Sequence, residues 1–158
     1  MMGRIVTIFL LMFSVTLCVS AQETLTSENT SSDTIWEPTF KSALEKAAKE
    51  NLPVLIYFTG SDWCGPCINL DKKLFHTEKF ETFAKGKMIG YIADFPRNSD
   101  LVSTENKKIN NELREKYDQS SFPTMIMINK KGKVLGRKNG AYLPEYYYPF
   151  FDKIAKKF

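Results

Sequence analysis

The sequence predicts an α/β fold with a central mixed sheet of about four to five strands and helices on both faces. Three observations predict it. Apolar strand-forming runs alternate with segments of helical periodicity, a short turn joins the last two strand candidates, and the 158 residues are 43% hydrophobic and 25% charged. Strands separated by helices pair in parallel through right-handed crossovers, whereas a hairpin adds an antiparallel pair. The length fits one domain.

The elements are assigned from hydrophobic periodicity along residues 36–158. The run VLIYF at 54–58 is apolar without interruption, which is typical of a strand buried on both faces. Pro149 lies inside the last helical segment, so that helix should kink or begin late. In chain order we expect a helix ending near Asn51, a strand over 54–58, helical turns from Cys64 to about 83, a strand over 88–95, a helix reaching Tyr117, strands over 124–128 and 134–136 joined by the turn 129–132, and a helix opened by Pro144.

The first residues have the pattern of an export signal. Arg4 precedes the uncharged run IVTIFLLMFSVTLCV at 5–19, which is too short to cross roughly 30 Å of hydrocarbon comfortably. Small residues end the pattern at Ala21, so we predict a secretory signal peptide over 1–21 that is cleaved after Ala21; an uncleaved anchor is the alternative. A flexible polar leader over 22–35 and a folded domain over 36–158 follow. We expect a periplasmic or secreted, soluble product.

Composition excludes several classes of protein. The formal charge of +4 is a mild excess that argues neither for nor against nucleic acid, but no long basic run or arginine-rich arm occurs, and we expect no nucleic-acid partner. We also expect a monomer. Three cysteines are too few for a disulfide-built scaffold. After removal of the signal, Cys64, Cys67 and His76 are the only Cys and His residues. That set is short of the four ligands of a structural zinc site, so we expect no metal and no other cofactor. We interpret His76 as an exposed residue at a helix end.

The sharpest signal is Cys64-Gly65-Pro66-Cys67 at the predicted start of a helix. Residues three apart share a helix face, so the two sulfurs can come within bonding distance. The helix N-terminus favours a thiolate, and Pro66 fits the first turn, where no N–H is needed. We predict that Cys64 is the exposed nucleophile and that Cys67 is the resolving cysteine, with a Cys64–Cys67 disulfide as the oxidised state. A purely structural disulfide and a zinc site shared between chains are the alternatives.

At this point the chain resembles the thioredoxin superfamily, in particular exported bacterial thioredoxin-like proteins. The resemblance covers about residues 36–157. It implies a thioredoxin fold, a cis peptide bond before Pro123 beside the disulfide, and pairing of the Phe122 backbone with an extended substrate. The residues that carry it are Trp63-Cys64-Gly65-Pro66-Cys67, Phe122-Pro123-Thr124, Lys131-Gly132-Lys133 and Asn139-Gly140-Ala141. By resemblance the substrate-binding residues are Trp63, Gly65, Pro66, Phe122 and Pro123.

The sequence departs from the family pattern in two places. Thioredoxins carry a buried acid that handles the proton of the inner cysteine, and the matching position here is Tyr57, a poor base near neutral pH. Water or another acid would then handle the proton; Asp94 is a weak candidate, with loop or helix capping as its simpler role. The segment 95–121 is longer than its thioredoxin counterpart and is interpreted as an insertion. It could contact a partner, or it could be a solvated helix.

These observations predict an exported thiol–disulfide oxidoreductase that reduces protein disulfides, because the Gly-Pro pair between the cysteines resembles reducing thioredoxins. Its partners would be proteins with disulfides or dithiols and a membrane-bound electron donor. An oxidase or isomerase of the same fold is the alternative, since the direction depends on redox potential. A non-catalytic peptide-binding module is the alternative from another class.

Overall fold

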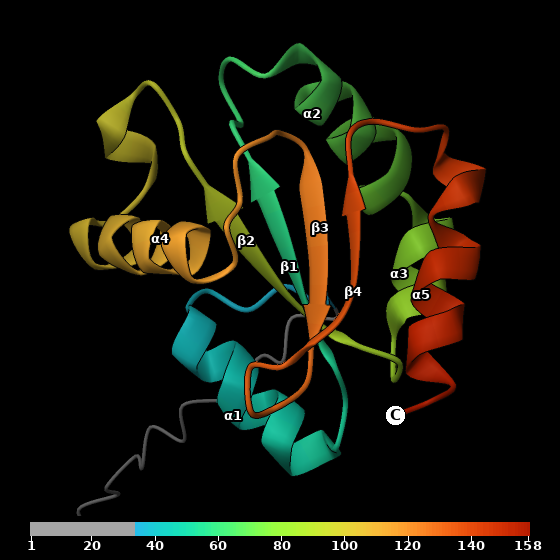
Figure 1. Cartoon of the computed structure of the whole chain (residues 1–158). Coiled ribbons are helices and arrows are strands. Elements are labelled where there is room, and N and C mark those ends of the chain that lie inside the picture. Colours follow the sequence, from blue (N-terminus) through green and yellow to red (C-terminus); the bar gives the residue numbers. More distant parts are fainter. Residues whose placement is uncertain (1–33) are drawn as a thin grey trace, which may run out of the picture. The chain divides into compact units, whose positions relative to one another are not determined.

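A four-stranded sheet in the order β2-β1-β3-β4 forms the centre of the fold (Figure 1). The strands are β1 (Val54–Thr59), β2 (Ile89–Asp94), β3 (Thr124–Ile128) and β4 (Val134–Asn139). β1 pairs in parallel with β2 and antiparallel with β3, and β3 pairs antiparallel with β4. The predicted mixed α/β sheet is therefore confirmed. The structure is a computed structural model that describes residues 34–158, so the predicted signal peptide and residues 22–33 of the predicted leader lie outside the described residues.

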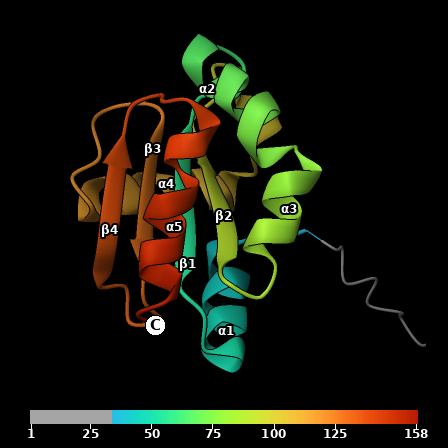
Figure 2. The same ribbon diagram turned by 90° about the vertical axis from the view of Figure 1, so that its right-hand side faces the viewer.

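Helices cover both faces of the sheet, and each layer buries its own apolar cluster (Figures 1 and 2). One face carries α1 (Phe40–Glu50) and α4 (Thr104–Lys116). The other carries α2 (Gly65–Leu70), a π-helical turn (Asp71–Phe75), α3 (Glu78–Ala84) and α5 (Tyr148–Ala155). Alternate residues of β1 enter opposite clusters, and all six are buried. The unbroken apolar run over 54–58 follows from that double burial.

Element boundaries differ from the prediction by a few residues. β4 extends to Asn139 instead of ending at Gly136, because pairing with β3 continues as far as Thr124. The last helix begins late: a 3₁₀ turn over Pro144–Tyr146 precedes α5, and Pro149 lies in its first turn, where proline is tolerated. A second 3₁₀ turn, Ser99–Leu101, precedes α4 and was not predicted.

The folded domain includes the end of the predicted leader. Ile35, assigned to the leader, is only 7% exposed and belongs to the core. Its carbonyl accepts a hydrogen bond from the Gly90 N–H at 2.8 Å, and the Glu37 N–H donates to the Gly90 carbonyl at the same distance. Trp36 thereby forms a bridge with the outer edge of β2. Burial of the apolar Ile35 side chain stabilises this contact. The sequence analysis assigned Ile35 to the leader because the residues before it are polar.

The segment 95–121 contains α4 and rests on the sheet. Leu113 is buried against it, and the buried Asn110 accepts a hydrogen bond from the Tyr91 hydroxyl at 2.6 Å. The Asn110 amide donates to the carbonyl of Asp94 at 2.9 Å, which ties the helix to the end of β2. Most other positions of α4 are exposed, so the charged helix is solvated on its outer side.

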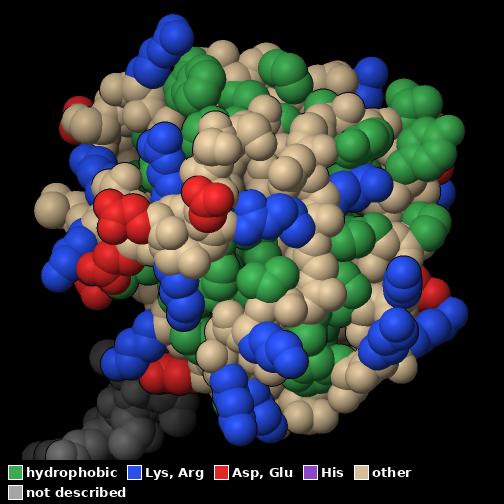
Figure 3. Space-filling view, in the orientation of Figure 1, with side chains coloured by type: hydrophobic (Ala, Val, Ile, Leu, Met, Phe, Trp, Pro, Cys, Tyr) green, Lys and Arg blue, Asp and Glu red, His purple; other side chains and the backbone are tan. Residues whose placement is uncertain are grey.

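The surface shows how charge is distributed. On the face seen in Figure 3, Lys and Arg side chains lie in separate groups with Asp and Glu among them.

None of the helices within residues 34–158 is long and apolar enough to cross a lipid bilayer.

Candidate functional site

Two cysteines are held where β1 passes into α2. β1 ends at Thr59, and a tight turn follows in which the Cys64 N–H donates to the Gly60 carbonyl at 2.8 Å. Cys64 is the N-cap of α2, and its carbonyl accepts from the Ile68 N–H at 3.0 Å. Pro66 falls in the first helical turn, where its missing N–H leaves no partner unsatisfied. Both sulfurs therefore lie at the positive end of a helix.

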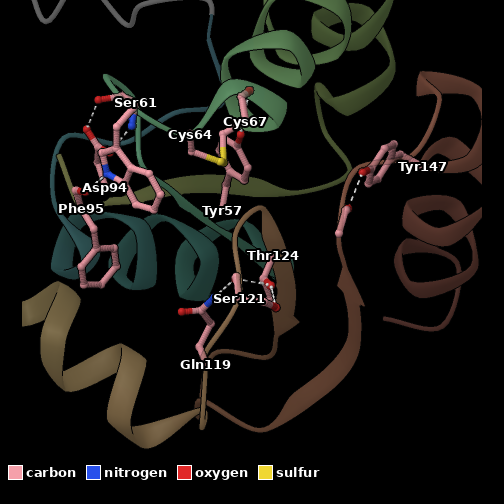
Figure 4. Close-up of a disulfide and its surroundings, with 12 residues drawn as sticks. Tyr57, Ser61, Cys64, Cys67, Asp94, Phe95, Gln119, Ser121, Thr124 and Tyr147 are labelled. Carbon is pink, nitrogen blue, oxygen red and sulfur yellow. Dashed lines mark hydrogen bonds between the residues drawn. A yellow bond between two sulfur atoms is a disulfide. The ribbon is translucent and has the colours of Figure 1, made fainter. Parts of the chain in front are cut away.

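The two cysteines form a disulfide, with their Cα atoms 5.2 Å apart (Figure 4). Cys67 is completely buried and Cys64 is 5% exposed. The expectation of an exposed Cys64 is therefore wrong in degree, because its sulfur is turned inward to bond the buried sulfur of Cys67. Cys64 is still the only one of the pair with any solvent contact.

Aromatic side chains stand beside the disulfide. We call Trp63, Phe95 and Phe122 the rim. The Trp63 and Phe122 rings meet edge to face at 5.7 Å, and Phe95 lies 5.4 Å from Phe122. Trp63 is 38% exposed, and its indole N–H donates to the Phe95 carbonyl at 2.8 Å. The rim presents an apolar surface next to Cys64.

Polar contacts fix the rim to the turn before Cys64. The Asp94 carboxylate accepts from the Ser61 N–H at 2.9 Å and from the Ser61 hydroxyl at 2.5 Å. The Asp62 carboxylate accepts from the N–H groups of Arg97 and Asn98 at 2.9 and 2.8 Å. These two N–H groups hold the pKa of Asp62 below its usual value. We call the contacts of Ser61 and Asp62 with residues 94–98 the clasp.

The sequence analysis missed Ser61, Asp62, Phe95 and Arg97 as parts of this site. Their signal was present but ambiguous: polar residues in the turn before Cys64, and a second polar segment directly after β2. Since β1 and β2 are parallel neighbours, their carboxyl ends meet at one edge of the sheet. Pairing those two loops needed the strand order, which the sequence did not supply.

The chain around Pro123 closes the site on the other side. The Phe122–Pro123 peptide bond is cis, as the resemblance implied. The Gly140 N–H donates to the Pro123 carbonyl at 2.8 Å, and Gly140 has φ of 83°, a conformation that favours glycine. Pro123 itself is buried, whereas Gly65 and Pro66 are exposed. The structure thus brings Trp63 and Phe122 together and leaves Gly65 and Pro66 open to solvent.

An aromatic layer, which we call the floor, adjoins Cys67: Tyr57, Phe75 and Phe80 are buried, and Trp36 is partly buried against them. The Tyr57 hydroxyl donates to the Cys67 carbonyl at 3.2 Å (Figure 4). The centre of the Tyr57 ring lies 4.6 Å from that of the Phe75 ring. Burial raises the pKa of Tyr57, so the hydroxyl stays protonated and is no base. Asp94 acts as a loop cap, because both its carboxylate oxygens accept from Ser61.

His76 ends the π-helical turn and its side chain is 69% exposed, as predicted for a helix-end residue. Its Nδ1 lies 3.1 Å from a carboxylate oxygen of Asp71. Within the described part of the chain, no group of three or more His, Cys, Asp and Glu side chains is placed to hold a metal ion.

Comparison with known proteins identifies the fold family. Residues 40–155 match the thioredoxin-like domain family. The chain belongs to this family. The disulfide bond reductase DsbH of Chlamydia pneumoniae is 32% identical over 102 residues, which is 65% of this chain and 60% of that protein. The thioredoxin-related protein DsbJ of the same organism is 29% identical over 70% of this chain and 32% of its own length. The chain thus spans less than two thirds of either curated relative.

Solved structures of thioredoxin-like proteins agree with this assignment. A structure of DsbH oxidoreductase superposes with a TM-score of 0.69 at 29% identity, covering 77% of this chain and 83% of that one. A thioredoxin from Thermus thermophilus superposes with a TM-score of 0.61 at 16% identity, covering 79% and 89%. The second likeness concerns the fold alone.

Proposed function

We propose that this thioredoxin-like protein is a thiol–disulfide oxidoreductase that reduces disulfides in other proteins. The observation that carries the proposal is the Cys64–Cys67 disulfide at the start of α2, with a trace of solvent contact at Cys64 and none at Cys67. A short loop of this kind contributes little to stability through chain entropy, so a purely structural role explains it poorly.

The two cysteines have different roles in the proposed reaction. In the reduced protein the Cys64 thiolate attacks a substrate disulfide, forms a mixed disulfide and releases one substrate thiol. The Cys67 thiol then loses its proton and attacks the Cys64 sulfur. The mixed disulfide breaks, the second substrate sulfur leaves as a thiolate and takes up a proton, and the Cys64–Cys67 bond forms. Two electrons pass from the protein to the substrate.

The rim is the proposed docking surface for the substrate. Trp63 offers an exposed apolar surface beside Cys64, the partly buried Phe122 ring meets it edge to face, and Gly65 and Pro66 leave the approach to the sulfur open. The buried Pro123 lies at the start of β3, so the backbone of Phe122 is placed to pair with an extended segment. Substrates are therefore expected to be flexible peptide segments that contain a disulfide.

Reduction is the favoured direction. The Gly-Pro pair resembles that of reducing thioredoxins, and the curated relative DsbH is named a disulfide bond reductase. We place the protein outside the cytoplasm, because residues 5–19 have the pattern of a signal peptide. A membrane-bound protein would then supply the electrons. The oxidase or isomerase alternative predicts a potential near about −120 to −180 mV, whereas a reductase lies closer to about −270 mV.

The test is reduction of a protein disulfide with dithiothreitol as electron source. We expect turnover by the parent, loss of turnover in Cys64→Ser, and a trapped mixed disulfide with substrate in Cys67→Ser, visible by mass spectrometry. Cys18→Ser in the full chain is the matched control and keeps full activity. Turnover of Cys64→Ser equal to the parent would disprove the proposal. A binding module would hold peptide equally well in all variants and reduce none.

A further inference from the structure

The proposed reaction, on which this inference rests, leaves one proton without an acceptor. Cys67 is completely buried, yet its thiol must lose a proton before it attacks Cys64. The neighbouring Tyr57 donates its hydroxyl proton to the Cys67 carbonyl and stays protonated. Water or an acidic side chain is left to accept this proton, and one acidic residue follows Cys67 on the same helix.

Asp71 is the acidic residue whose position one turn along the helix from Cys67 fits this role. It follows Cys67 by four residues, and the Asp71 N–H donates to the Cys67 carbonyl, which is the hydrogen bond of a regular α-helical turn. Residues spaced in this way lie on the same helix face. The same carbonyl accepts from the Tyr57 hydroxyl, so Cys67, Asp71 and Tyr57 converge on one atom. The Asp71 side chain is 35% exposed, which gives a proton a way out to solvent.

A change of helix type sets the surroundings of Asp71. From Asp71 to Phe75 the chain forms a π-helical turn, in which the His76 N–H donates to the Asp71 carbonyl at 2.9 Å. This five-residue spacing brings the His76 ring to the Asp71 carboxylate, 3.1 Å away. The only histidine of the chain thus pairs with the acid beside the inner cysteine. Turns of this type occur often at functional sites.

The charged and titratable groups that face Asp71 come from three elements. Tyr57 lies on β1, Asp94 on β2 and His76 at the end of the π turn. Burial raises the pKa of Asp71, and protonated His76 opposes that rise. A carboxyl with a raised pKa is a better proton acceptor near neutral pH. Asp94 is not available in the same way, since Ser61 occupies both of its carboxylate oxygens.

We propose that the Asp71 carboxylate takes up the proton of the Cys67 thiol and that the neighbouring His76 side chain modulates this proton uptake. As Cys67 attacks Cys64, the proton moves to the Asp71 carboxylate, and the bond between Cys64 and the substrate sulfur breaks. The substrate leaves as a thiolate, and Asp71 returns a proton to it through solvent. The proton that Cys67 loses thus ends on the released substrate sulfur. The two electrons that the substrate gains come from the oxidation of Cys64 and Cys67 to the disulfide.

The test is the pH dependence of single-turnover disulfide reduction by the reduced protein between pH 5 and 9. In Asp71→Asn we expect the resolution step to slow by at least about tenfold and its dependence on the Asp71 ionisation to disappear. Asp71→Glu restores part of that dependence. His76→Gln moves it to higher pH, because the cation that lowers the pKa of Asp71 is gone. Asp152→Asn, on α5, is the matched control and keeps the parent profile.

A second measurement does not depend on turnover. Thiolate absorbance in a background with both Cys18→Ser and Cys64→Ser reports the Cys67 pKa alone, and Asp71→Asn is expected to lower it, since a nearby negative charge is removed. An Asp71→Asn titration that superimposes on the parent's overturns the inference. The inference is also overturned if the pH dependence of disulfide reduction is unchanged in Asp71→Asn but shifted in Asp94→Asn. In that case the proposed reductase function still stands. A parent without turnover refutes the function, while the thiol titration still decides the role of Asp71.

Discussion

The rim and the floor lie on opposite sides of one disulfide and are built differently. The floor is a continuous aromatic layer in which Tyr57, Phe75 and Phe80 are at most 2% exposed. The rim is half open and is held by hydrogen bonds between two loops, the clasp. The contrast shows that aromatic packing sets the environment of the inner cysteine, Cys67. Access to the outer cysteine, Cys64, depends instead on polar contacts that can change without unfolding the protein.

The largest effect is expected from emptying the floor. Phe75→Ala removes a ring that touches Trp36, Tyr57 and Phe80, and it leaves a cavity. We expect the free energy of unfolding to fall by about 3–5 kcal/mol, as for other buried Phe→Ala changes. Urea denaturation measures it. Trp63→Ala on the rim is the comparison, and an equal loss there would remove the distinction between the two regions.

The next effect comes from overfilling the floor. A Cβ on Gly90 would lie 2.4 Å from a ring carbon of Trp36, so Gly90→Ala forces the indole to move. We expect a loss of about 1–3 kcal/mol, typical of an overpacked core. At Gly65, beside the rim, a Cβ meets nothing within 4 Å. Thermal unfolding of Gly65→Ala is expected to match the parent, and a comparable loss at both glycines would contradict this account.

A smaller change in stability but a clear change in function is expected on the rim. Trp63→Phe keeps an aromatic ring and removes the indole N–H that donates to the Phe95 carbonyl. One such hydrogen bond contributes about 0.5–1.5 kcal/mol. Disulfide reduction is expected to slow several-fold through weaker substrate binding, seen as a raised KM. A fall in kcat with an unchanged KM would contradict a role of Trp63 in substrate binding.

The smallest effect is local and depends on pH. The pKa of Asp62 is lowered in the folded protein, so its contribution to the clasp is present above its ordinary pKa of 3.8 and is lost as pH falls through the lowered value. Asp62→Ala is expected to speed amide exchange at Arg97 and Asn98 relative to the parent above pH 3.8, with global stability unchanged, and the difference shrinks as pH falls through the lowered pKa. The Lys131 and Lys133 amides, which donate to the non-titrating Asn129 side chain, are the internal control. Unchanged exchange at Arg97 would show that the clasp does not depend on Asp62.

Sequence reasoning found what depends on local pattern. The cysteine motif, the buried strand at 54–58 and the late start of α5 follow from spacing, apolar runs and proline, and the structure has all three. The clasp could not be found in this way, because Asp62 and Arg97 are 35 residues apart and meet only once β1 and β2 are paired. The limited exposure of Cys64 could not be predicted either, because it depends on packing against segments that are distant in the sequence.

The role of Asp71 was missed for a different reason. Four-residue spacing from Cys67 was visible in the sequence, but an acid on a helix is most often an exposed, solvated one. Its partial burial and its place among Tyr57, Asp94 and His76 distinguish it. The π-helical turn that brings His76 to it has no known signature in the residues that form it.

The bridge between Trp36 and Gly90 has a mechanical consequence. Residues 35–37 run alongside β2 in parallel and are attached to it by two backbone hydrogen bonds at Gly90. A load applied through residues 35–37 therefore passes directly to β2 and to the Trp36 ring, which packs on Tyr57 and Phe75. Detaching these three residues would take one ring out of the floor, so the attachment couples the outer edge of the sheet to the aromatic layer at Cys67.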